Sequence, residues 1–459
     1  MRRRMEKALA RGSSLIAVVL LASALLAPIG ARVSSQRSGG SGDLGHSLEA
    51  PPPEVQLPPG EELPSRTVVI DVDSPERALY RIAVPALLGD GALGNEGAEV
   101  LRNDFRLISL FEVLDPRSFI ANLDAEELGI VPASWQAVGA QGVVKGRVLR
   151  DGNRIRAEMR FFELARGDAP SLSRSYSGAL ADFRGFMHDF ANEVVRVLTG
   201  KPGSFGSRIL FARRIREGRK DIYVASFDGH SVARVSSGKG VAMLPAFGPG
   251  GIWYSVLTET GMYITRTGEE ERPIIDAENS INMGVTFCGG RMYFTSTRDG
   301  NAEIYSALPD GTDLQRLTND PAIDVSPACG GPGGIIAFVS NRHGTPQIFA
   351  MNPDGSNVRR LTYRGSYNQT PAWCPDPSQH LLAFTGRAGG LDVFTVNIQT
   401  QEYLRLTQGQ GVNKDPAFSP DCRMIAFYSS RGGIFISNPE GLNQQLVIPG
   451  AAETLRWGR

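Results

Sequence analysis

The sequence is poor in the residues from which catalytic and metal centres are usually built. It has 4 cysteines and 5 histidines among 459 residues. There is no Cys-x-x-Cys pair, no His-Glu-x-x-His motif and no Gly-x-Ser-x-Gly nucleophile elbow. These absences argue against a zinc site, a zinc peptidase and an α/β-hydrolase. We expect a protein that is not an enzyme and that needs neither a metal nor a cofactor.

An excess of basic charge is also absent. Lysine and arginine together number 48, and so do aspartate and glutamate. A protein that binds nucleic acid by neutralising phosphates needs a strong basic excess. Nucleic acid is therefore not an expected partner.

Long apolar runs are missing, apart from one near the start of the chain. An uncharged stretch spans residues 15–27, small residues follow it, and five basic residues precede it: Arg2, Arg3, Arg4, Lys7 and Arg11. The stretch is shorter than the roughly 20 residues that a membrane-spanning helix needs. The pattern predicts a cleaved signal peptide over residues 1–31 and hence an exported protein. Its removal would leave about four net negative charges.

Two further regions precede the repeats described below. Residues 32–66 are rich in Ser, Gly, Pro and Glu and predict a flexible tether. Residues 67–203 predict a small α/β domain, with strands over 67–72, 81–84, 111–114, 142–148 and 154–164 and a helix over 95–107. Apolar residues at steps of three and four predict a second helix from Leu180 to Leu198, which Gly200 ends.

A glycine motif in this domain resembles a dinucleotide-binding fingerprint. Gly89 to Gly94 fits Gly-x-Gly-x-x-Gly, and Asp115 follows 21 residues after the last glycine. The rest of the domain does not read as a second nucleotide-binding half. We therefore expect an ordinary glycine-rich turn and no bound cofactor.

Repeats of about forty residues fill positions 204–459. Strand signals such as Pro327-Ala328-Cys329, Ile336-Ala337-Phe338 and Ile348-Phe349 recur along the region, and Arg-Leu-Thr marks a fourth strand at Arg316, Arg360 and Arg405. Short antiparallel strands at this period predict an all-β propeller with six blades. The first copy lacks its innermost strand, and we expect residues 454–457 to supply it and close the ring.

The four cysteines lie on or near the first strands of different blades. They are Cys288, Cys329, Cys374 and Cys422. Corresponding positions of different blades should lie too far apart for the roughly 4.4–6.8 Å between Cα atoms that a disulfide requires. We expect buried free thiols.

One end of the propeller collects polar residues suited to binding. Turns between the second and third strands carry Arg298, Arg342, Arg387 and Arg431, and polar loops precede each first strand. Arginine is a common anchor of protein interfaces. The alternative is that each arginine pairs with a neighbour such as Asp299, or satisfies a loop carbonyl, and serves the fold alone.

The sequence resembles the TolB family of the Tol-Pal system. The junction from Leu198-Thr199-Gly200 through Gly203-Ser204-Phe205 to Ser207-Arg208-Ile209 is its most specific part, and Trp135 to Ala140 with Val144 to Val148 matches the first domain. The resemblance implies a periplasmic, monomeric scaffold that is not an enzyme. Such a scaffold supports outer-membrane integrity and constriction during cell division.

The resemblance also implies two protein partners. The propeller would dock on the lipoprotein Pal, with Asn282, Asp324, Gln369, Thr370 and Asp415 as candidates beside Arg298, Arg342 and Arg387. The segment Val68, Val69, Ile70, Asp71 and Val72 would bind TolA. The tether separates this segment from the mature N-terminus, and the repeat over 252–275 lacks the arginine turn.

A second function class stays open at this stage. Carboxylates such as Asp299, Glu303 and Asp392 are plentiful, and a glycosidase needs only two of them about 5–10 Å apart. A periplasmic propeller hydrolase or sugar-binding protein would use the central channel. That reading predicts a channel wide enough for a ligand.

Overall fold

The computed structural model describes residues 79–238, 240–268 and 272–459. The predicted signal peptide, the tether and the strand over 67–72 lie outside the described residues. Among the residues that are described, no helix is long and apolar enough to cross a membrane.

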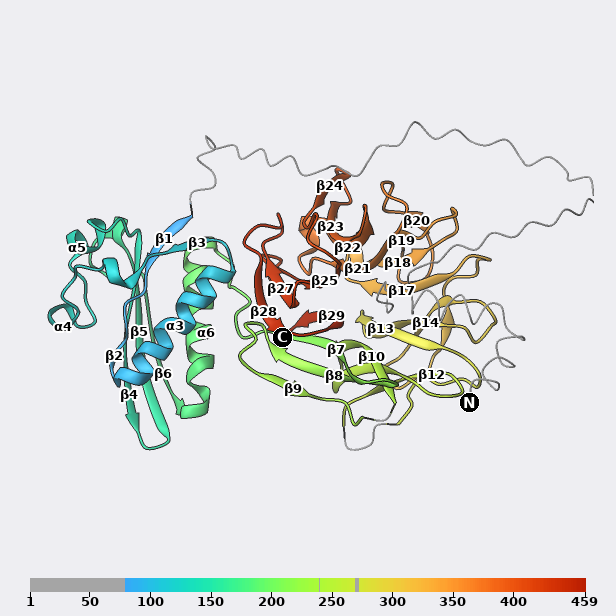
Figure 1. Cartoon of the computed structure of the whole chain (residues 1–459), viewed down its shortest axis with the longest axis horizontal. Helices are drawn as coiled ribbons and strands as arrows, with labels where there is room; N and C mark the ends of the chain where they lie inside the picture. Colours follow the sequence, from blue (N-terminus) through green and yellow to red (C-terminus); the bar gives the residue numbers. More distant parts are fainter. Residues whose placement is uncertain (1–78, 239, 269–271) are drawn as a thin grey trace, which may run out of the picture. The chain divides into compact units, whose positions relative to one another are not determined.

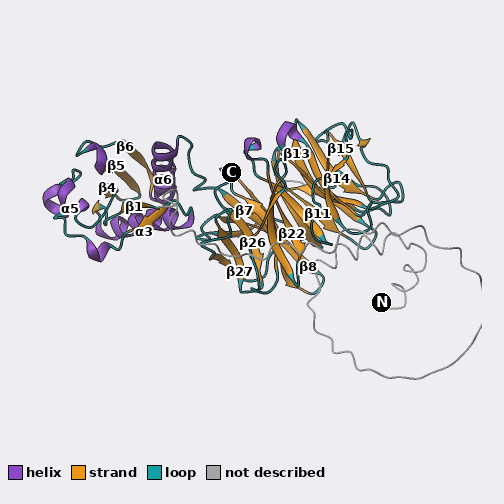
Figure 2. Ribbon diagram, turned by 90° about the horizontal axis from the view of Figure 1, so that it is seen from above, coloured by secondary structure: helices purple, strands orange, loops and turns teal. Residues whose placement is uncertain are grey.

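A mixed sheet with helices forms the α/β part (Figures 1 and 2). Its strands run in the order β3-β1-β4-β5-β6, with β2 against β4 and with β1 parallel to both β3 and β4. The elements are β1 Tyr80–Ala83, β2 Leu88–Gly89, α3 Gly91–Leu107, β3 Phe111–Val113, η2 Pro116–Ser118, α4 Leu123–Glu126, α5 Pro132–Gln136, β4 Gly142–Asp151, β5 Arg154–Glu163, η3 Leu164–Arg166, β6 Leu172–Ala179, η4 Leu180–Asp182 and α6 Phe183–Thr199.

Capping residues set the start of α3 and the end of α6. Asp90 caps α3, since its carboxylate accepts from the amides of Ala92 and Leu93, and the helix therefore starts four residues before the predicted position. Gly200 ends α6 in the left-handed conformation, as predicted. The sequence did not predict β6, an edge strand of mostly polar residues, only one of which is buried.

Short strands make up the rest of the chain (Figure 1). They are β7 Arg208–Arg216, β8 Arg219–Ser226, β9 Val232–Arg234, β10 Val241–Gly248, β11 Gly251–Leu257, β12 Met262–Arg266, β13 Asn282–Cys288, β14 Arg291–Ser296, β15 Glu303–Ala307, β16 Gln315–Arg316, β17 Asp324–Cys329, β18 Ile336–Ser340, β19 Gln347–Met351, β20 Arg359–Arg360, β21 Asn368–Trp373, β22 Leu381–Arg387, β23 Leu391–Asn397, β24 Glu402–Arg405, β25 Asn413–Phe418, β26 Ile425–Ser429, β27 Gly433–Ser437, β28 Gln445–Pro449 and β29 Glu453–Gly458, with short helices η5 Pro332–Gly334 and η6 Pro377–Gln379.

These strands group into repeats that we number along the chain. Repeats 3 to 6 are the four-stranded sheets β13–β16, β17–β20, β21–β24 and β25–β28. Repeat 2 comprises β10–β12, which share one seven-stranded sheet with repeat 1 because β10 pairs with β8. Repeat 1 comprises β7–β9 together with β29, which pairs antiparallel with β7. The inner strands contact one another in the order β29, β10, β13, β17, β21 and β25, and β25 contacts β29 again.

Each inner strand carries a bulge at the same place. The register of all six shifts near the third residue, and the residue there has a positive φ in every case: Leu244, Gly284, Ser326, Thr370, Asp415 and Thr454. At five of these positions the amide donates to a side-chain oxygen of the preceding repeat. For example, the Ser326 amide donates to Thr295 Oγ1 at 3.2 Å, and the Asp415 amide donates to Thr385 Oγ1 at 3.0 Å. The bulges therefore bond each of these five inner strands to the preceding repeat.

The expectation of free thiols is wrong. Cys288 is bonded to Cys329 and Cys374 to Cys422, with Cα atoms 6.1 and 5.4 Å apart. The inner strands converge toward the middle of the propeller, so corresponding positions of adjacent repeats lie within disulfide range. The error was to treat all the repeats as equally distant. The bonds join repeat 3 to repeat 4 and repeat 5 to repeat 6.

Candidate partner-binding face

The turn between the second and third strands lies at the same end of each repeat as the start of its inner strand. Asn282 pairs with Ser296, Asp324 with Ser340, and Asn413 with Ser429. We call this end of the propeller the turn face. The arginines of the turns and the candidate residues at the starts of the inner strands all belong to it.

Asn282 and Asp324 lie inside the protein beneath the turn face. Both are completely buried. The Oδ1 atom of Asn282 accepts from Ser296 at 2.7 Å and from Arg298 at 3.1 Å, and Asp324 Oδ2 accepts from Arg342 at 2.7 Å. Burial raises the pKa of Asp324, although hydrogen bonds from Ser340 and Arg342 oppose the rise. These two side chains hydrogen-bond the turn residues from the interior of the propeller and are not exposed at the surface.

Arg298 and Arg342 are held from two sides. The Nε atom of each donates to a serine hydroxyl two residues earlier, at 3.0 Å. Their guanidinium groups also lie over the rings of Tyr305 and Phe349, at 5.3 and 5.2 Å from the centroids. Arg298 does not pair with Asp299, the neighbour considered from the sequence. The two arginines are thus partly exposed, and their side chains already bind neighbouring residues of the fold.

Arg387 differs from the other turn arginines. In repeat 5 the inner-strand residue Asn368 pairs with Gly386, where repeats 3, 4 and 6 have serine. Arg387 therefore sits one residue earlier in the register than Arg298 and points to the other side of its strand. It is exposed and stacks on Tyr367 at 4.8 Å. The buried Oδ1 of Asn368 has no hydrogen-bond partner, and neither has that of Asn413 in repeat 6.

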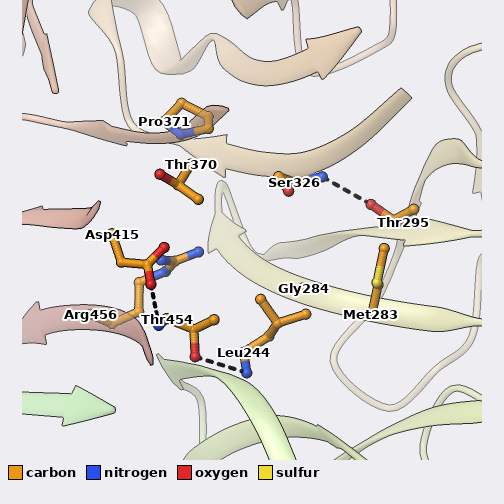
Figure 3. Close-up of a pocket in the computed structure, with 10 residues that line it drawn as sticks. All are labelled: Leu244, Met283, Gly284, Thr295, Ser326, Thr370, Pro371, Asp415, Thr454 and Arg456. Atoms are coloured by element: carbon orange, nitrogen blue, oxygen red, sulfur yellow. Dashed lines mark hydrogen bonds between the residues drawn. The ribbon is translucent and has the colours of Figure 1, made fainter. Parts of the chain in front are cut away.

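Thr370 and Asp415 line a small cavity on the axis of the inner strands, and Gln369 adjoins them (Figure 3). Gln369 and Asp415 are 6% and 3% exposed. Thr370 Oγ1 lies 2.6 Å from Thr385 Oγ1, and Asp415 Oδ2 accepts from the Thr454 amide at 2.9 Å. A partner surface that rests on the rim therefore does not meet Gln369 or Asp415 unless the loops move.

Arg456 lines the same cavity and was not singled out from the sequence. Burial lowers its pKa, whereas the charge of Asp415 opposes that shift. At the corresponding register the other inner strands carry small residues: Ala246, Thr286, Ala328, Ala372 and Ala417. Aligning the repeats by sequence would have shown this arginine at a position where the other five repeats have Ala or Thr.

The axial cavity is too small for a sugar. Its volume is about 30 Å³. A single water needs roughly 10–15 Å³ by the same measure, whereas sites for small molecules usually enclose about 300–1,000 Å³. The cavity holds a few waters at most, which disfavours the channel as a ligand site.

A basic hairpin was also missed. The β7–β8 ladder continues to the Arg216–Arg219 pair, beyond the Arg213–Asp221 pair, where the corresponding ladders of repeats 3, 4 and 6 have ended. The hairpin therefore projects from the turn face. Five of the eight residues over 213–220 are basic, a run that is visible in the sequence.

The glycine motif at Gly89 to Gly94 has a structural role. A Cβ at Gly89 would lie 2.1 Å from the carbonyl oxygen of Val148, and one at Gly94 equally close to that of Leu87. The Asp90 carboxylate occupies the helix N-terminus, where a nucleotide phosphate would have to bind. Asp115 instead caps a short 3₁₀ helix and pairs with Arg117. The two glycines allow close contact of β2 with β4 and of α3 with the carbonyl of Leu87.

Comparison with known families identifies both parts of the chain. Residues 68–169 match the TolB amino-terminal domain, and residues 195–385 match the TolB β-propeller domain. The chain belongs to the TolB family. The TolB match reaches from the α/β part into the repeats, as the junction residues of the sequence indicated.

TolB proteins of known sequence and structure are similar to the chain. It is 35% identical over 287 residues to the Tol-Pal system protein TolB of Anaeromyxobacter dehalogenans strain 2CP-C, covering 59% of this chain and 64% of that protein. It is 30% identical over 257 residues to that of Desulfosudis oleivorans, covering 52% and 58%. The chain thus spans less than two thirds of the length of these relatives.

A solved TolB structure shares the fold. The crystal structure of TolB from Acinetobacter baumannii superposes with a TM-score of 0.71 at 22% identity, over 83% of this chain and 96% of that one. Within residues 79–238, 240–268 and 272–459, no group of three or more His, Cys, Asp or Glu side chains could hold a metal ion.

Proposed function

We propose that this protein is a periplasmic scaffold of the Tol-Pal system that docks the turn face of its propeller on the lipoprotein Pal. The observation that carries the proposal is the TolB match over both parts of the chain. Relatives named Tol-Pal system protein TolB support membership of that system. Docking of this kind joins the outer membrane to the envelope and supports constriction during division.

We infer that the repeats form six blades and that β29 completes the first of them. The cyclic contacts of the inner strands and the pairing of β29 with β7 support this arrangement. A closed ring leaves no long sheet edge exposed and gives the turn face a rigid floor. Such a floor suits a protein that binds partners without catalysis.

The sites that we propose differ in how they would act. Arg298, Arg342 and Arg387 offer their side chains at the turn face, whereas Asn282, Asp324, Gln369 and Asp415 would act by holding the loops in place. TolA would bind the segment Val68, Val69, Ile70, Asp71 and Val72, which lies outside the described residues. An extended segment like this one adds to a partner sheet mainly through backbone hydrogen bonds.

The test is a calorimetric titration of residues 32–459 with the periplasmic domain of Pal from the same organism. Saturable binding with one site per chain is the expected result. No binding at tens of micromolar would contradict the Pal assignment. A sugar-binding propeller would instead be stabilised by sugars in a thermal-shift screen, a result that the small axial cavity disfavours.

A further inference from the structure

Four exposed arginines on consecutive repeats of the turn face have no acidic partner. They are Arg387 of repeat 5, Arg431 of repeat 6, and Arg214 and Arg216 of repeat 1. None has a carboxylate oxygen within 4.0 Å among the described residues, whereas Arg342, Arg219 and Lys220 of the same face are paired. We call these four residues the basic crescent. The inner strands of its three repeats, β21, β25 and β29, lie side by side.

Local packing holds two of the four arginines, Arg387 and Arg431, in place. Arg431 donates to Ser429 Oγ at 2.9 Å and to Gln444 Oε1 at 2.7 Å, and it stacks on Phe435. Arg387 stacks on Tyr367. Arg214 and Arg216 stand on the projecting hairpin, on either side of Ile215, which is 45% exposed. Preordered arginines such as Arg387 and Arg431 are typical of energetically important interface residues, because little side-chain entropy remains to be lost.

Repeat 2, which adjoins repeat 1 of the crescent, is acidic on the same face. Glu259, Asp276 and Glu278 of its loops are exposed. Asp299 of repeat 3 is exposed as well, but it pairs with Arg316. A flat anionic bilayer laid over the turn face would meet these carboxylates as well as the arginines. A protein partner, unlike a bilayer, can carry its acidic groups only where they face the arginines. The division of charge therefore favours a protein partner over a membrane surface.

We propose that the basic crescent binds an acidic patch of the protein that docks on the turn face. This inference rests on the proposed docking and specifies its chemistry: carboxylates of the partner pair with Arg214, Arg216, Arg387 and Arg431. Opposite charges at an interface rim accelerate association and orient the partner. The acidic side of the face sets the rotation of the partner about the propeller axis by repelling its acidic patch.

The experiment compares two doubly substituted proteins by titration with the Pal domain at 50 and 300 mM salt. Arg214→Glu/Arg216→Glu alters the crescent. Arg154→Glu/Arg359→Glu makes the same change of charge at exposed, unpaired arginines outside the turn face. We expect the crescent variant to bind about tenfold more weakly at low salt and to lose most of the salt dependence, because like charges then face each other. The control should stay within about twofold of the unaltered protein.

The outcomes separate the two proposals. If the unaltered protein binds and both variants bind equally well, the crescent inference is wrong and Pal docking stands. If the unaltered protein does not bind Pal, the docking proposal fails, and a fluorescent octaglutamate peptide then tests the crescent alone. Equal peptide binding by both variants overturns the inference, as does binding to anionic vesicles without binding to the peptide. Arg214→Gln/Arg216→Gln replaces the crescent variant if circular dichroism shows that the glutamates prevent folding.

Discussion

At the scale of single residues, buried charges depend on a few named partners. Asp104 of α3 is fully buried, and its Oδ2 lies 2.8 Å from Nδ1 of His188 on α6. Burial raises the pKa of Asp104 to about 6, although the hydrogen bond and the charge of His188 lower it; nearby, Asp228 raises it further and Arg184 lowers it. The folded protein therefore holds this proton more tightly than the unfolded chain does.

The first prediction concerns the pH dependence that Asp104 creates. Since its pKa is higher in the folded state, its contribution favours folding below pH 4 and is lost as the pH rises through about 6. Asparagine cannot lose a proton there, so the stability of Asp104→Asn relative to the unaltered protein should increase between pH 4.5 and 7.5. Urea unfolding at both values measures the change. The exposed Asp168→Asn serves as control, and equal shifts in the two variants would refute the assignment.

The candidate residues show where reading the sequence fails at this scale. Asn282, Asp324 and Asp415 are polar and follow polar loops, which suggests surface positions. Their pairing register instead places them beneath the turns or beside the axis, where arginine, hydroxyl and amide groups donate to one side-chain oxygen of each residue. Register depends on contacts between strands that are distant in sequence, so the amino-acid pattern alone could not decide it.

At the scale of elements, the repeat period and the helix signals predicted most of the strands and both long helices. Apolar strand residues and Asp-Gly turns are local features, so they can be recognised in the sequence without knowledge of the fold. The disulfides and the offset of Arg387 depend on distances between repeats, which the sequence does not state. Repeat 2 lacks the arginine turn, and no fourth strand is assigned to it within the described residues.

The second prediction is that the two disulfides differ in access. Cys374 and Cys422 are 1% and 4% exposed, whereas Cys288 and Cys329 are partly exposed. Dithiothreitol should therefore reduce Cys288–Cys329 first, because a thiolate must reach a sulfur atom. Timed alkylation with mass spectrometry identifies the reduced pair. Earlier labelling of Cys374 and Cys422 would show that exposure does not govern the order.

The third prediction is that removing either disulfide costs stability. The bonds close loops with sequence separations of 41 and 48 residues. The chain-entropy relation gives about 4 kcal/mol for loops of this size, and measured losses are commonly 2–5 kcal/mol. Double serine variants of each pair should unfold at lower denaturant concentration than the oxidised protein, and reduced unaltered protein should behave in the same way. Unchanged midpoints would rule out a stabilising role.

The fourth prediction tests the C-terminal strand. Trp457 of β29 is 9% exposed, and its Nε1 donates to Ser207 Oγ at 2.7 Å. Trp457→Ala should lower the free energy of unfolding by about 3–5 kcal/mol, because a large buried ring and a hydrogen bond are lost from the strand that pairs with β7. Arg459→Ala, at the end of the chain, is the matched control. A loss as small as that of the control would argue against ring closure by β29.

At the scale of the whole molecule, one end of the propeller is the proposed binding surface. Its floor consists of buried polar residues that bond adjacent strands, and its rim carries arginines with few acidic partners. The axial cavity, with a volume of about 30 Å³, is too small for a sugar. Binding at the rim by a protein partner agrees with all of these features, and the family match gives that partner its proposed identity.

Hydrogen exchange of the propeller with and without the Pal domain tests the central claim most directly. The account predicts slower exchange of the second-to-third-strand turns, over residues 297–302 and 341–346, when Pal is bound. Exchange of the turns at the opposite end, around Gly311 and Gly355, should not change. Protection confined to those opposite turns, or none anywhere in the presence of saturating Pal, would contradict docking at the turn face.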